Sequence, residues 1–233
     1  MKSIRTLMAN KFRIIKVLRL VNRAYGRPKH LKKTDPVDEL VRTILSQNTN
    51  DRNSLAAFAV LKREFRSWEA LLKAPVGRIA RLIKHAGLSN IKAKRIKGVL
   101  AEIKRRESRI SLTVLKQLDP AAGLDYLRSL KGVGPKTAAC VLLFGFSKPV
   151  MPVDTHIFRV TKRLGLIPGR LNIEDAHEAL TKLVPKRLIY QFHLGIIEHG
   201  RRTCKAQNPR CGFCVLYNVC LFKDKRRYKG AGQ

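Results

Sequence analysis

The sequence predicts an all-α fold built from many short helices. Apolar residues recur every three or four positions through most of the chain, as they do on one face of an α-helix. We find no run of alternating apolar and polar residues, the pattern that is typical of a half-buried strand. Short breaks such as Ala74-Pro75 and Ala86-Gly87 separate the helical segments. We therefore expect helices packed on helices.

The first 34 residues predict an amphipathic basic helix. They contain eleven Lys or Arg residues and no acidic residue. Apolar side chains fall on one helical face and basic side chains on the opposite face, namely Ile14, Leu18, Val21 and Tyr25 against Lys16, Arg19 and Arg23. We expect this helix to pack its apolar stripe on the rest of the protein, in preference to lying on a membrane surface.

Acidic residues mark the expected starts of the next helices. Asp35-Pro36 is typical of an N-cap followed by a first-turn proline. The apolar residues that should face inward on this helix are Leu40, Val41, Ile44 and Leu45. The helix ends in the polar run SQNTND, where we expect Asp51 to cap the following helix.

The charge of the chain predicts a polyanionic partner. Lys and Arg number 49 against 16 Asp and Glu, which gives a formal net charge of +33. Such a surface binds nucleic acid through its phosphates. At 233 residues and 45% hydrophobic content, the chain can also bury the core that an enzyme needs. Neither a run of 18 apolar residues nor a signal-peptide pattern occurs, so we expect an intracellular protein with no membrane partner.

The segment LRSLKGVGPKTAACVLLF predicts two helices joined by a hairpin. Gly132 and Gly134 allow a sharp turn, and Pro135 starts the second helix. The backbone N–H groups of Gly132, Val133 and Gly134 would suit a DNA phosphate. A bare GVG turn often only joins helices, but the apolar register on both sides favours DNA binding.

Asp154, in PVDTHIFRVTKRLG, precedes a helix on which Ile157, Val160 and Leu164 share a face. We expect Asp154 to be the N-cap of that helix. Capping alone would explain an aspartate at this position.

Four cysteines form a group with the spacing C-x6-C-x2-C-x5-C: Cys204, Cys211, Cys214 and Cys220. In a reducing compartment this group favours metal ligation over disulfides. The spacing by itself leaves zinc and a [4Fe-4S] cluster as alternatives. Cys140 lies outside the group, on an apolar helix, and is expected in the core.

Residues 132–137 and 153–156 together resemble the helix-hairpin-helix DNA glycosylase superfamily, and the cysteine spacing is similar to that of its endonuclease III branch. The resemblance implies two helical domains flanking a DNA-binding cleft. A six-helix barrel with the helix-hairpin-helix would span 31–144. The second domain would combine 1–30 with 145–233 and carry a [4Fe-4S] cluster on the four cysteines.

The resemblance also implies an activity. The chain would be a base-excision-repair DNA glycosylase with AP lyase activity that removes damaged, most often oxidised, pyrimidines. Lys136 corresponds to the Schiff-base lysine and Asp154 to the catalytic aspartate. An amine attacks only when neutral, and a position just inside a helix N-terminus among other cations favours the neutral form.

Several DNA contacts follow from the same resemblance. Asn48 or its neighbour Gln47 would fill the gap left by the flipped base, and Leu88 would wedge into the base stack. Lys205 and Arg210, between the first two cysteines, would face phosphate. A capped loop end and a loop-anchoring leucine are the plain alternatives for the first two assignments.

One departure leaves the substrate open. Arg128 stands eight positions before Lys136, where endonuclease III tends to have an acidic residue. A monofunctional mismatch or uracil-type glycosylase and a non-catalytic iron-sulfur DNA-binding protein are the alternatives. We expect a monomer that acts on double-stranded DNA containing a damaged base, in the cytoplasm of a prokaryote at its nucleoid.

Overall fold

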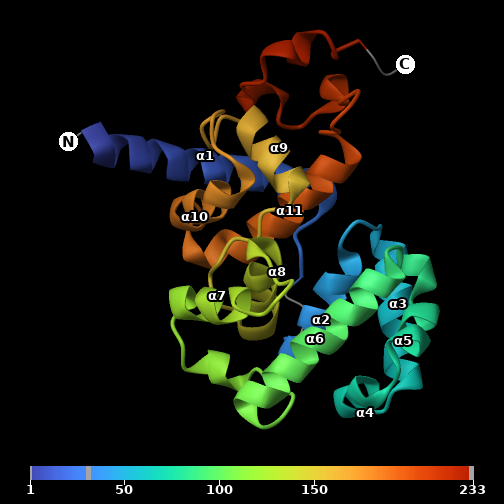
Figure 1. The fold of residues 1–233 in the computed structure, drawn as a ribbon. Helices are drawn as coiled ribbons and strands as arrows, with labels where there is room; N and C mark the ends of the chain where they lie inside the picture. The colour runs from blue at the N-terminus through green and yellow to red at the C-terminus, as the bar shows by residue number, and fades with distance from the viewer. Residues whose placement is uncertain (1, 30–32, 231–233) are drawn as a thin grey trace. The chain divides into compact units, whose positions relative to one another are not determined.

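The computed structural model describes residues 2–29 and 33–230, the first nine of them as backbone only, and every regular element in these ranges is helical (Figure 1). The all-α prediction is therefore confirmed. Contacts divide the chain into two compact units, Lys32–Lys148 and the combination of Met1–Leu31 with Pro149–Gln233. The first of these units is inserted in the sequence between the two parts of the second.

The described part of Lys32–Lys148 contains seven α-helices. They are α2 Pro36–Ser46, α3 Asp51–Glu64, α4 Trp68–Lys73, α5 Val76–Leu82, α6 Ser89–Glu107, α7 Pro120–Arg128 and α8 Pro135–Cys140. Short helical turns complete the unit: η1 Lys84–Ala86, η2 Thr113–Lys116 and η3 Val141–Gly145, which continues α8. Helix α2 contacts α3, α6, α8 and η3, so it lies at the centre of this unit.

The inward face of α2 is the one that the sequence predicts. Its apolar residues are fully buried: Leu40, Val41, Ile44 and Leu45. The start of the helix is also confirmed, because the Asp35 carboxylate accepts hydrogen bonds from the backbone N–H groups of Val37 and Asp38.

The expected cap of α3 is wrong by one residue. The side chain of Asn50 accepts a hydrogen bond of 2.9 Å from the N–H of Asn53, and Asp51 is the first residue of the helix. Both residue types cap well, and the extended backbone falls at Asn50. In the first turn, Asp51 instead places negative charge at the positive end of the helix dipole.

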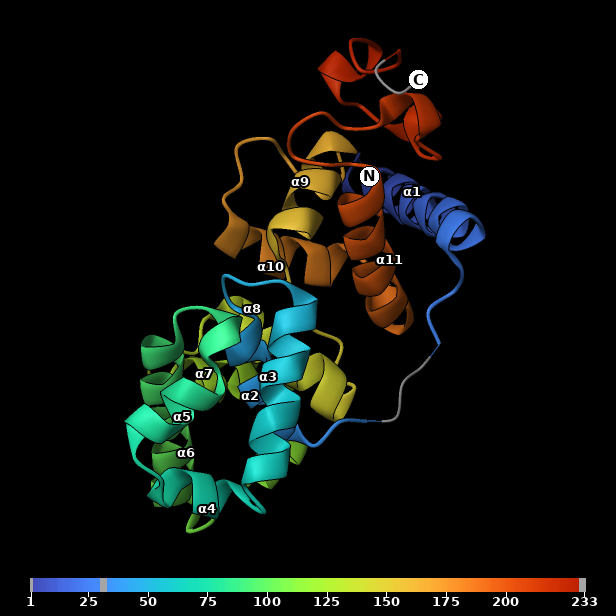
Figure 2. The same ribbon diagram turned by 90° about the vertical axis from the view of Figure 1, so that its right-hand side faces the viewer.

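The described residues of the other unit form α1 Lys2–Tyr25, α9 Thr155–Arg163, α10 Ile173–Leu183 and α11 Ile189–Arg202. Four short turns accompany them: η4 Lys186–Leu188, η5 Cys211–Phe213, η6 Tyr217–Val219 and η7 Lys223–Arg226. Figures 1 and 2 show α1 beside α11, although these helices stand at opposite ends of the sequence.

The packing of α1 confirms its predicted apolar stripe. Ile14, Leu18 and Val21 are buried. A Cβ added at Gly195 of α11 would lie 2.8 Å from Val21 Cγ1, so the two helices approach closely there. Within the described ranges, none of the helices is both long enough and apolar enough to cross a membrane.

Candidate functional site

The hairpin between α7 and α8 has the predicted sharp turn. Gly132 has φ +89°, and Gly134 is the N-cap of α8 with Pro135 in the first turn. The positive φ favours glycine at this position, and a Cβ at position 132 would lie 2.6 Å from Arg95 Nε, so a larger residue would also require that side chain to shift. A Cβ at Gly134 would meet nothing within 4 Å. Arg95 therefore lies close to the turn at Gly132, whereas Gly134 faces open space.

Lys136 is the second residue of α8 and is half-buried. Lys136 interacts electrostatically with Glu39 of α2. Burial raises the pKa of the Glu39 carboxyl, whereas the positive charges of Arg42 and Lys136 lower it. The glutamate is held by Thr34 and Thr43, whose hydroxyls donate hydrogen bonds of 3.3 Å to its two oxygens. The amine thus stands in the field of a buried carboxyl group.

Gln47 is linked to the segment that carries Lys136. Its Nε2 donates to Thr137 Oγ1 at 3.4 Å, and its Oε1 accepts from Arg95 Nη1. Both ends of the amide are therefore engaged with the protein. The next residue, Asn48, is exposed and has φ 51°, in the left-handed region.

Leu88 lies on the loop between η1 and α6. Its φ is 47° and the residue is 50% exposed. A Cβ at Gly87, where φ is +70°, would lie 4.0 Å from the carbonyl oxygen of Asn48. The structure thus brings the predicted gap-filling loop and the predicted wedge loop next to each other.

Asp154 belongs to the other unit, where it is the N-cap of α9. Its carboxylate accepts a hydrogen bond of 2.8 Å from the N–H of Ile157, and its side chain is half-buried. The capping prediction is confirmed. Lys136 and Asp154 are therefore each placed by a helix N-terminus within their own unit.

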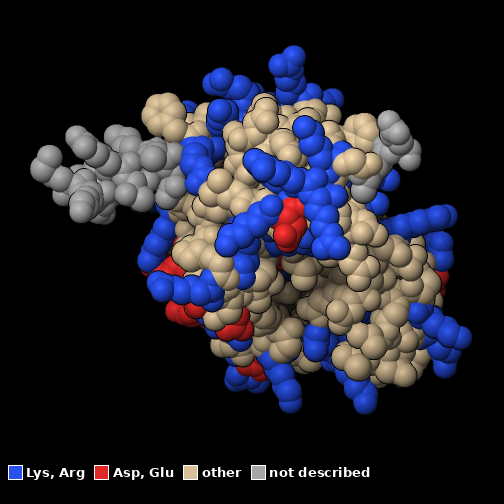
Figure 3. All heavy atoms as spheres, turned by 90° about the horizontal axis from the view of Figure 1, so that it is seen from above, with Lys and Arg blue, Asp and Glu red and all other residues tan. Residues whose placement is uncertain are grey.

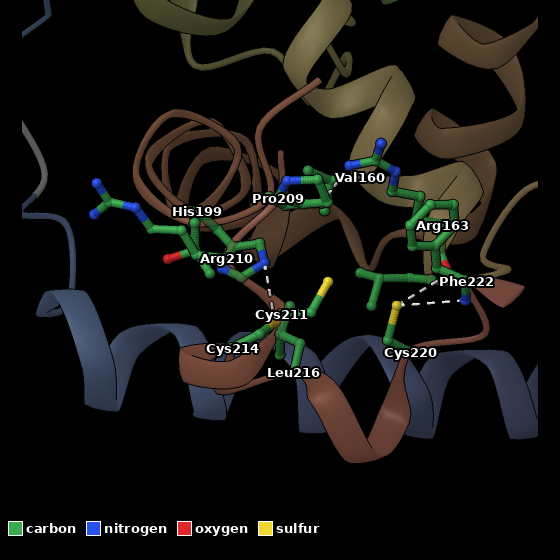
Figure 4. Close-up of a pocket in the computed structure, with 13 residues that line it drawn as sticks. Val160, Arg163, His199, Pro209, Arg210, Cys211, Cys214, Leu216, Cys220 and Phe222 are labelled. Atoms are coloured by element: carbon green, nitrogen blue, oxygen red, sulfur yellow. Dashed lines mark hydrogen bonds between the residues drawn. The ribbon is translucent and has the colours of Figure 1, made fainter. Parts of the chain in front are cut away.

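The four cysteines line one pocket, together with His199 and Arg163 (Figure 4). Cys204 follows α11, Cys211 and Cys214 lie at the two ends of η5, and Cys220 follows η6. In the described part of the chain, no group of three or more His, Cys, Asp and Glu side chains has the spacing of a metal site. The cysteine side chains nevertheless converge on one cavity from three short segments.

The electrostatics of this pocket are unfavourable for free thiolates. Burial raises the pKa of Cys214 to about 12, and it also raises the pKa of Cys211 and of Cys220. The charges of neighbouring cysteines act in the same direction. Four sulfurs brought this close favour a cationic centre among them, because a metal ion reverses that repulsion. The donor set is thus one that suits zinc or an iron-sulfur cluster.

Two residues missed in the sequence support the cysteine pocket. Arg163 of α9 donates from Nη1 to Cys204 Sγ at 3.4 Å and to the carbonyl of Lys205 at 2.7 Å. His199 Nε2 lies 3.8 Å from Cys214 Sγ (Figure 4). Burial lowers the pKa of His199 to about 4. In a chain with 49 Lys and Arg, no sequence signal singles out Arg163.

Lys205 and Arg210 are both exposed on the segment between the first two cysteines. Arg210 is tied to the body by its backbone N–H, which donates to the carbonyl of Thr203 at 3.0 Å. On the face shown in Figure 3, Lys and Arg cover much of the surface and acidic residues form a few small areas. Cys140 is buried, as predicted, and does not line the pocket described above.

Comparisons with known proteins show the family. A profile of the HhH-GPD superfamily base excision DNA repair proteins matches residues 41–186. The chain belongs to this superfamily. Endonuclease III of Thermotoga maritima is 40% identical over 203 residues, which cover 87% of this chain and 90% of that protein. Endonuclease III of Escherichia coli K12 is 36% identical, with 82% of this chain and 86% of that protein covered.

Solved structures give the same result. A non-covalent endonuclease III–DNA complex has a TM-score of 0.79 at 27% identity, covering 93% of this chain and 97% of that one. A trapped endonuclease III–DNA covalent intermediate has the same TM-score of 0.79 at 27% identity. The resemblance inferred from the hairpin, the aspartate and the cysteines is confirmed at the level of the family and the fold.

Proposed function

We propose that this chain is a base excision repair DNA glycosylase that also cleaves the strand, with Lys136 as the nucleophile. The observation that carries the proposal is the place of Lys136, half-buried at the start of α8 directly after the hairpin turn. The endonuclease III relatives support a bifunctional activity. A relative trapped as a covalent DNA intermediate supports an attacking group on the protein.

In the first step, the neutral Lys136 amine attacks C1′ of a flipped nucleotide. The C1′–N bond breaks, and the base leaves with the bonding electrons and takes up a proton. The attacking nitrogen gives up one proton, the C1′–O4′ bond breaks with O4′ taking up a proton, and the opened sugar is left as a protonated imine, an iminium, on Lys136. The role of the half-buried Asp154 carboxylate in this proposal is to stabilise the positive charge that develops on the sugar.

The second step follows from the imine. An iminium group acidifies the hydrogen on C2′, so removal of that proton expels the 3′ phosphate by β-elimination. The strand is thereby cut and the lysine remains as an imine until water releases it. A glycosylase without a nucleophilic amine would release the base and leave the strand intact.

DNA contacts in this proposal come from the hairpin and the two neighbouring loops. Gly132, Val133 and Gly134 present backbone N–H groups to phosphate, with Gly134 on the open side of the turn. Asn48 enters the gap left by the base, because Gln47 is engaged at both ends of its amide. Leu88 is exposed and takes the role of the wedge.

The cysteine pocket holds a [4Fe-4S] cluster in this proposal, with Cys204, Cys211, Cys214 and Cys220 as ligands. When bound, such a cluster would crosslink the three short segments that carry the cysteines. Lys205 and Arg210 are then presented to phosphate from a fixed loop. Metal analysis and visible absorbance distinguish the cluster from zinc, because Zn²⁺ is d¹⁰ and has no redox states.

The proposed substrate is double-stranded DNA with an oxidised pyrimidine, acted on by a monomer in the cytoplasm of a prokaryote at its nucleoid. Arg128 is exposed at the end of α7. Endonuclease III usually has an acidic residue at this position. Arg128 would therefore present a positive charge to the flipped base in place of a negative one. Comparison of thymine glycol with uracil and thymine mismatches therefore belongs with the first assays.

Borohydride trapping tests the nucleophile. With an oligonucleotide that carries thymine glycol or an abasic site, reduction of the imine should link the DNA covalently to the protein. Lys136→Gln should abolish the adduct. Lys131→Gln is the matched control, since Lys131 is exposed in the same hairpin and should leave trapping intact. If no adduct forms on any lesion while base release persists, the chain is a monofunctional glycosylase.

A further inference from the structure

Lys92 is a buried lysine that takes no part in the proposed reaction. It lies on α6, only 1% of its surface is exposed, and it is among the largest fully buried side chains of the protein. Its Nζ donates two hydrogen bonds of 2.7 Å, to the backbone carbonyls of Leu45 and Ala86. Lysine is almost never buried to this extent without partners, so these two bonds explain its presence.

An apolar side chain would fill the same space without the free-energy cost of burying a charged group. Replacement of buried charged groups by apolar residues of similar volume is often neutral or stabilising. Burial lowers the pKa of Lys92, because the charged ammonium group loses its hydration in the interior. A neutral amine would still have two hydrogens for the two carbonyls. The two hydrogen bonds, more than the space filled, are therefore what lysine contributes at this position.

The two carbonyls belong to the two loops that are proposed to enter DNA. Leu45 is in the last turn of α2, three residues before Asn48. Ala86 is the last residue of η1, two residues before Leu88. Carbonyls at helix ends have no partner within the helix, and a lysine ammonium is a suitable donor for them. One side chain thus fixes the chain ends from which both loops depart.

Both loops turn through a left-handed residue, and the one at Leu88 is strained. Asn48 and Leu88 are non-glycine residues at φ 51° and 47°. Asparagine tolerates the left-handed region, but leucine does so rarely, and such a conformation persists where the surroundings hold it. One turn further along α6, Arg95 reaches Gln47 and lies close to Gly132. The same side of α6 therefore supports both loops and the hairpin.

We propose that Lys92 is a positioning residue that ties the Asn48 loop to the Leu88 loop, so that both side chains enter the DNA duplex as one preformed pair. The inference rests on the proposed function. It adds that the ability to flip a base out of a duplex depends on Lys92, whereas imine formation at an already exposed sugar does not. An abasic site in a single strand needs neither gap filling nor a wedge.

The test uses the full-length holoenzyme with Lys92→Met, which is unbranched and close to lysine in volume, is one heavy atom shorter, and removes the donors. Single-turnover rates are compared on duplex DNA with thymine glycol and on a single-stranded abasic oligonucleotide. We expect the duplex rate to fall about tenfold or more and the single-strand rate to stay within about twofold. 2-Aminopurine beside the lesion should lose the fluorescence increase that reports unstacking.

Lys97→Met is the matched control. Lys97 lies on the same helix and also donates to a backbone carbonyl. Its acceptor, at 2.5 Å, is the carbonyl of Ala74, the residue that follows α4. This variant should lose stability without changing the ratio of the two rates. If Lys92→Met lowers both rates equally, or if Lys97→Met changes the ratio as much, Lys92 only supports the fold and the inference is overturned. If the wild type forms no adduct with the single strand, the proposed lysine chemistry fails instead.

A double-mutant cycle keeps the inference testable should Lys92→Met not fold. Asn48→Ala and Leu88→Ala change exposed side chains and should leave the fold intact. If the two loops act as a pair, the combined variant should lose less duplex activity than the product of the single losses. Strict additivity would overturn the pairing.

Discussion

At the scale of single residues, the two proposed catalytic groups are placed by the ordinary requirements of helix ends. Asp154 satisfies the N–H of Ile157, and Lys136 stands in the first turn of α8. Any helix start offers such positions. Asp154 therefore has a structural role that would exist without chemistry, and its variants must separate the two roles.

Asp154→Asn and Asp154→Ala make that separation. Asparagine caps a helix about as well as aspartate, whereas alanine costs about 1 kcal/mol of stability. Asp154→Asn should therefore unfold at the wild-type denaturant concentration and still lose base excision, because it lacks the charge. Asp154→Ala should lose both. Denaturant unfolding and single-turnover excision measure the two effects. Full activity of Asp154→Asn would leave Asp154 with capping as its only role.

The hairpin glycines make a second pair of residue-scale variants. Gly132→Ala should destabilise the protein by about 2 kcal/mol, because φ is +89° and the new Cβ would clash with Arg95. Gly134→Ala should cost less, about 0.5–1 kcal/mol, because a Cβ there meets no atom within 4 Å and only the weaker N-capping of alanine counts against it. It should still weaken DNA binding if a phosphate approaches that face. Equal stability of the two variants would contradict the geometry.

At the scale of elements, the sequence predicts what local patterns determine. The stripe of α1, the inward face of α2, the turn at Gly132 and the cap at Asp154 each depend on a few neighbouring residues. The cap of α3 is wrong because Asn50 and Asp51 are both good caps and the local pattern does not choose between them.

Contacts between distant segments could not be predicted in this way. Lys92 reaches Leu45 across 47 positions, and Arg95 reaches Gln47 across 48. Both are basic residues among 49, on a helix whose other basic residues are mostly exposed. Only the packing of α6 against α2 makes them specific. The family resemblance predicts roles for Gln47, Asn48 and Leu88 that stay predictions, but it gives no sign of Lys92 and Arg95, which bond to their loops.

At the scale of the whole molecule, charge dominates binding to undamaged DNA. The net charge is +33, and each phosphate that a Lys or Arg neutralises releases counterions. Affinity for lesion-free duplex should fall by about 10³-fold or more between about 50 and 200 mM salt. The preference for a lesion should vary much less, because phosphate contacts position the protein and pocket contacts specify the base. Fluorescence anisotropy at several salt concentrations measures both, and a flat salt dependence would exclude a phosphate-dominated interface.

The arrangement of the chain also sets an order of events during its synthesis. Helix α1 leaves the ribosome before residues 32–148, but its buried face packs against α11, which is translated after them. Residues 32–148 form their own compact unit and can fold in the interval. The nascent chain therefore carries an uncovered apolar helix, with Ile14, Leu18 and Val21 exposed, until its last third has been made. A chaperone that binds apolar helical faces of nascent chains would bind α1 soon after its synthesis and would be released only when α11 has formed.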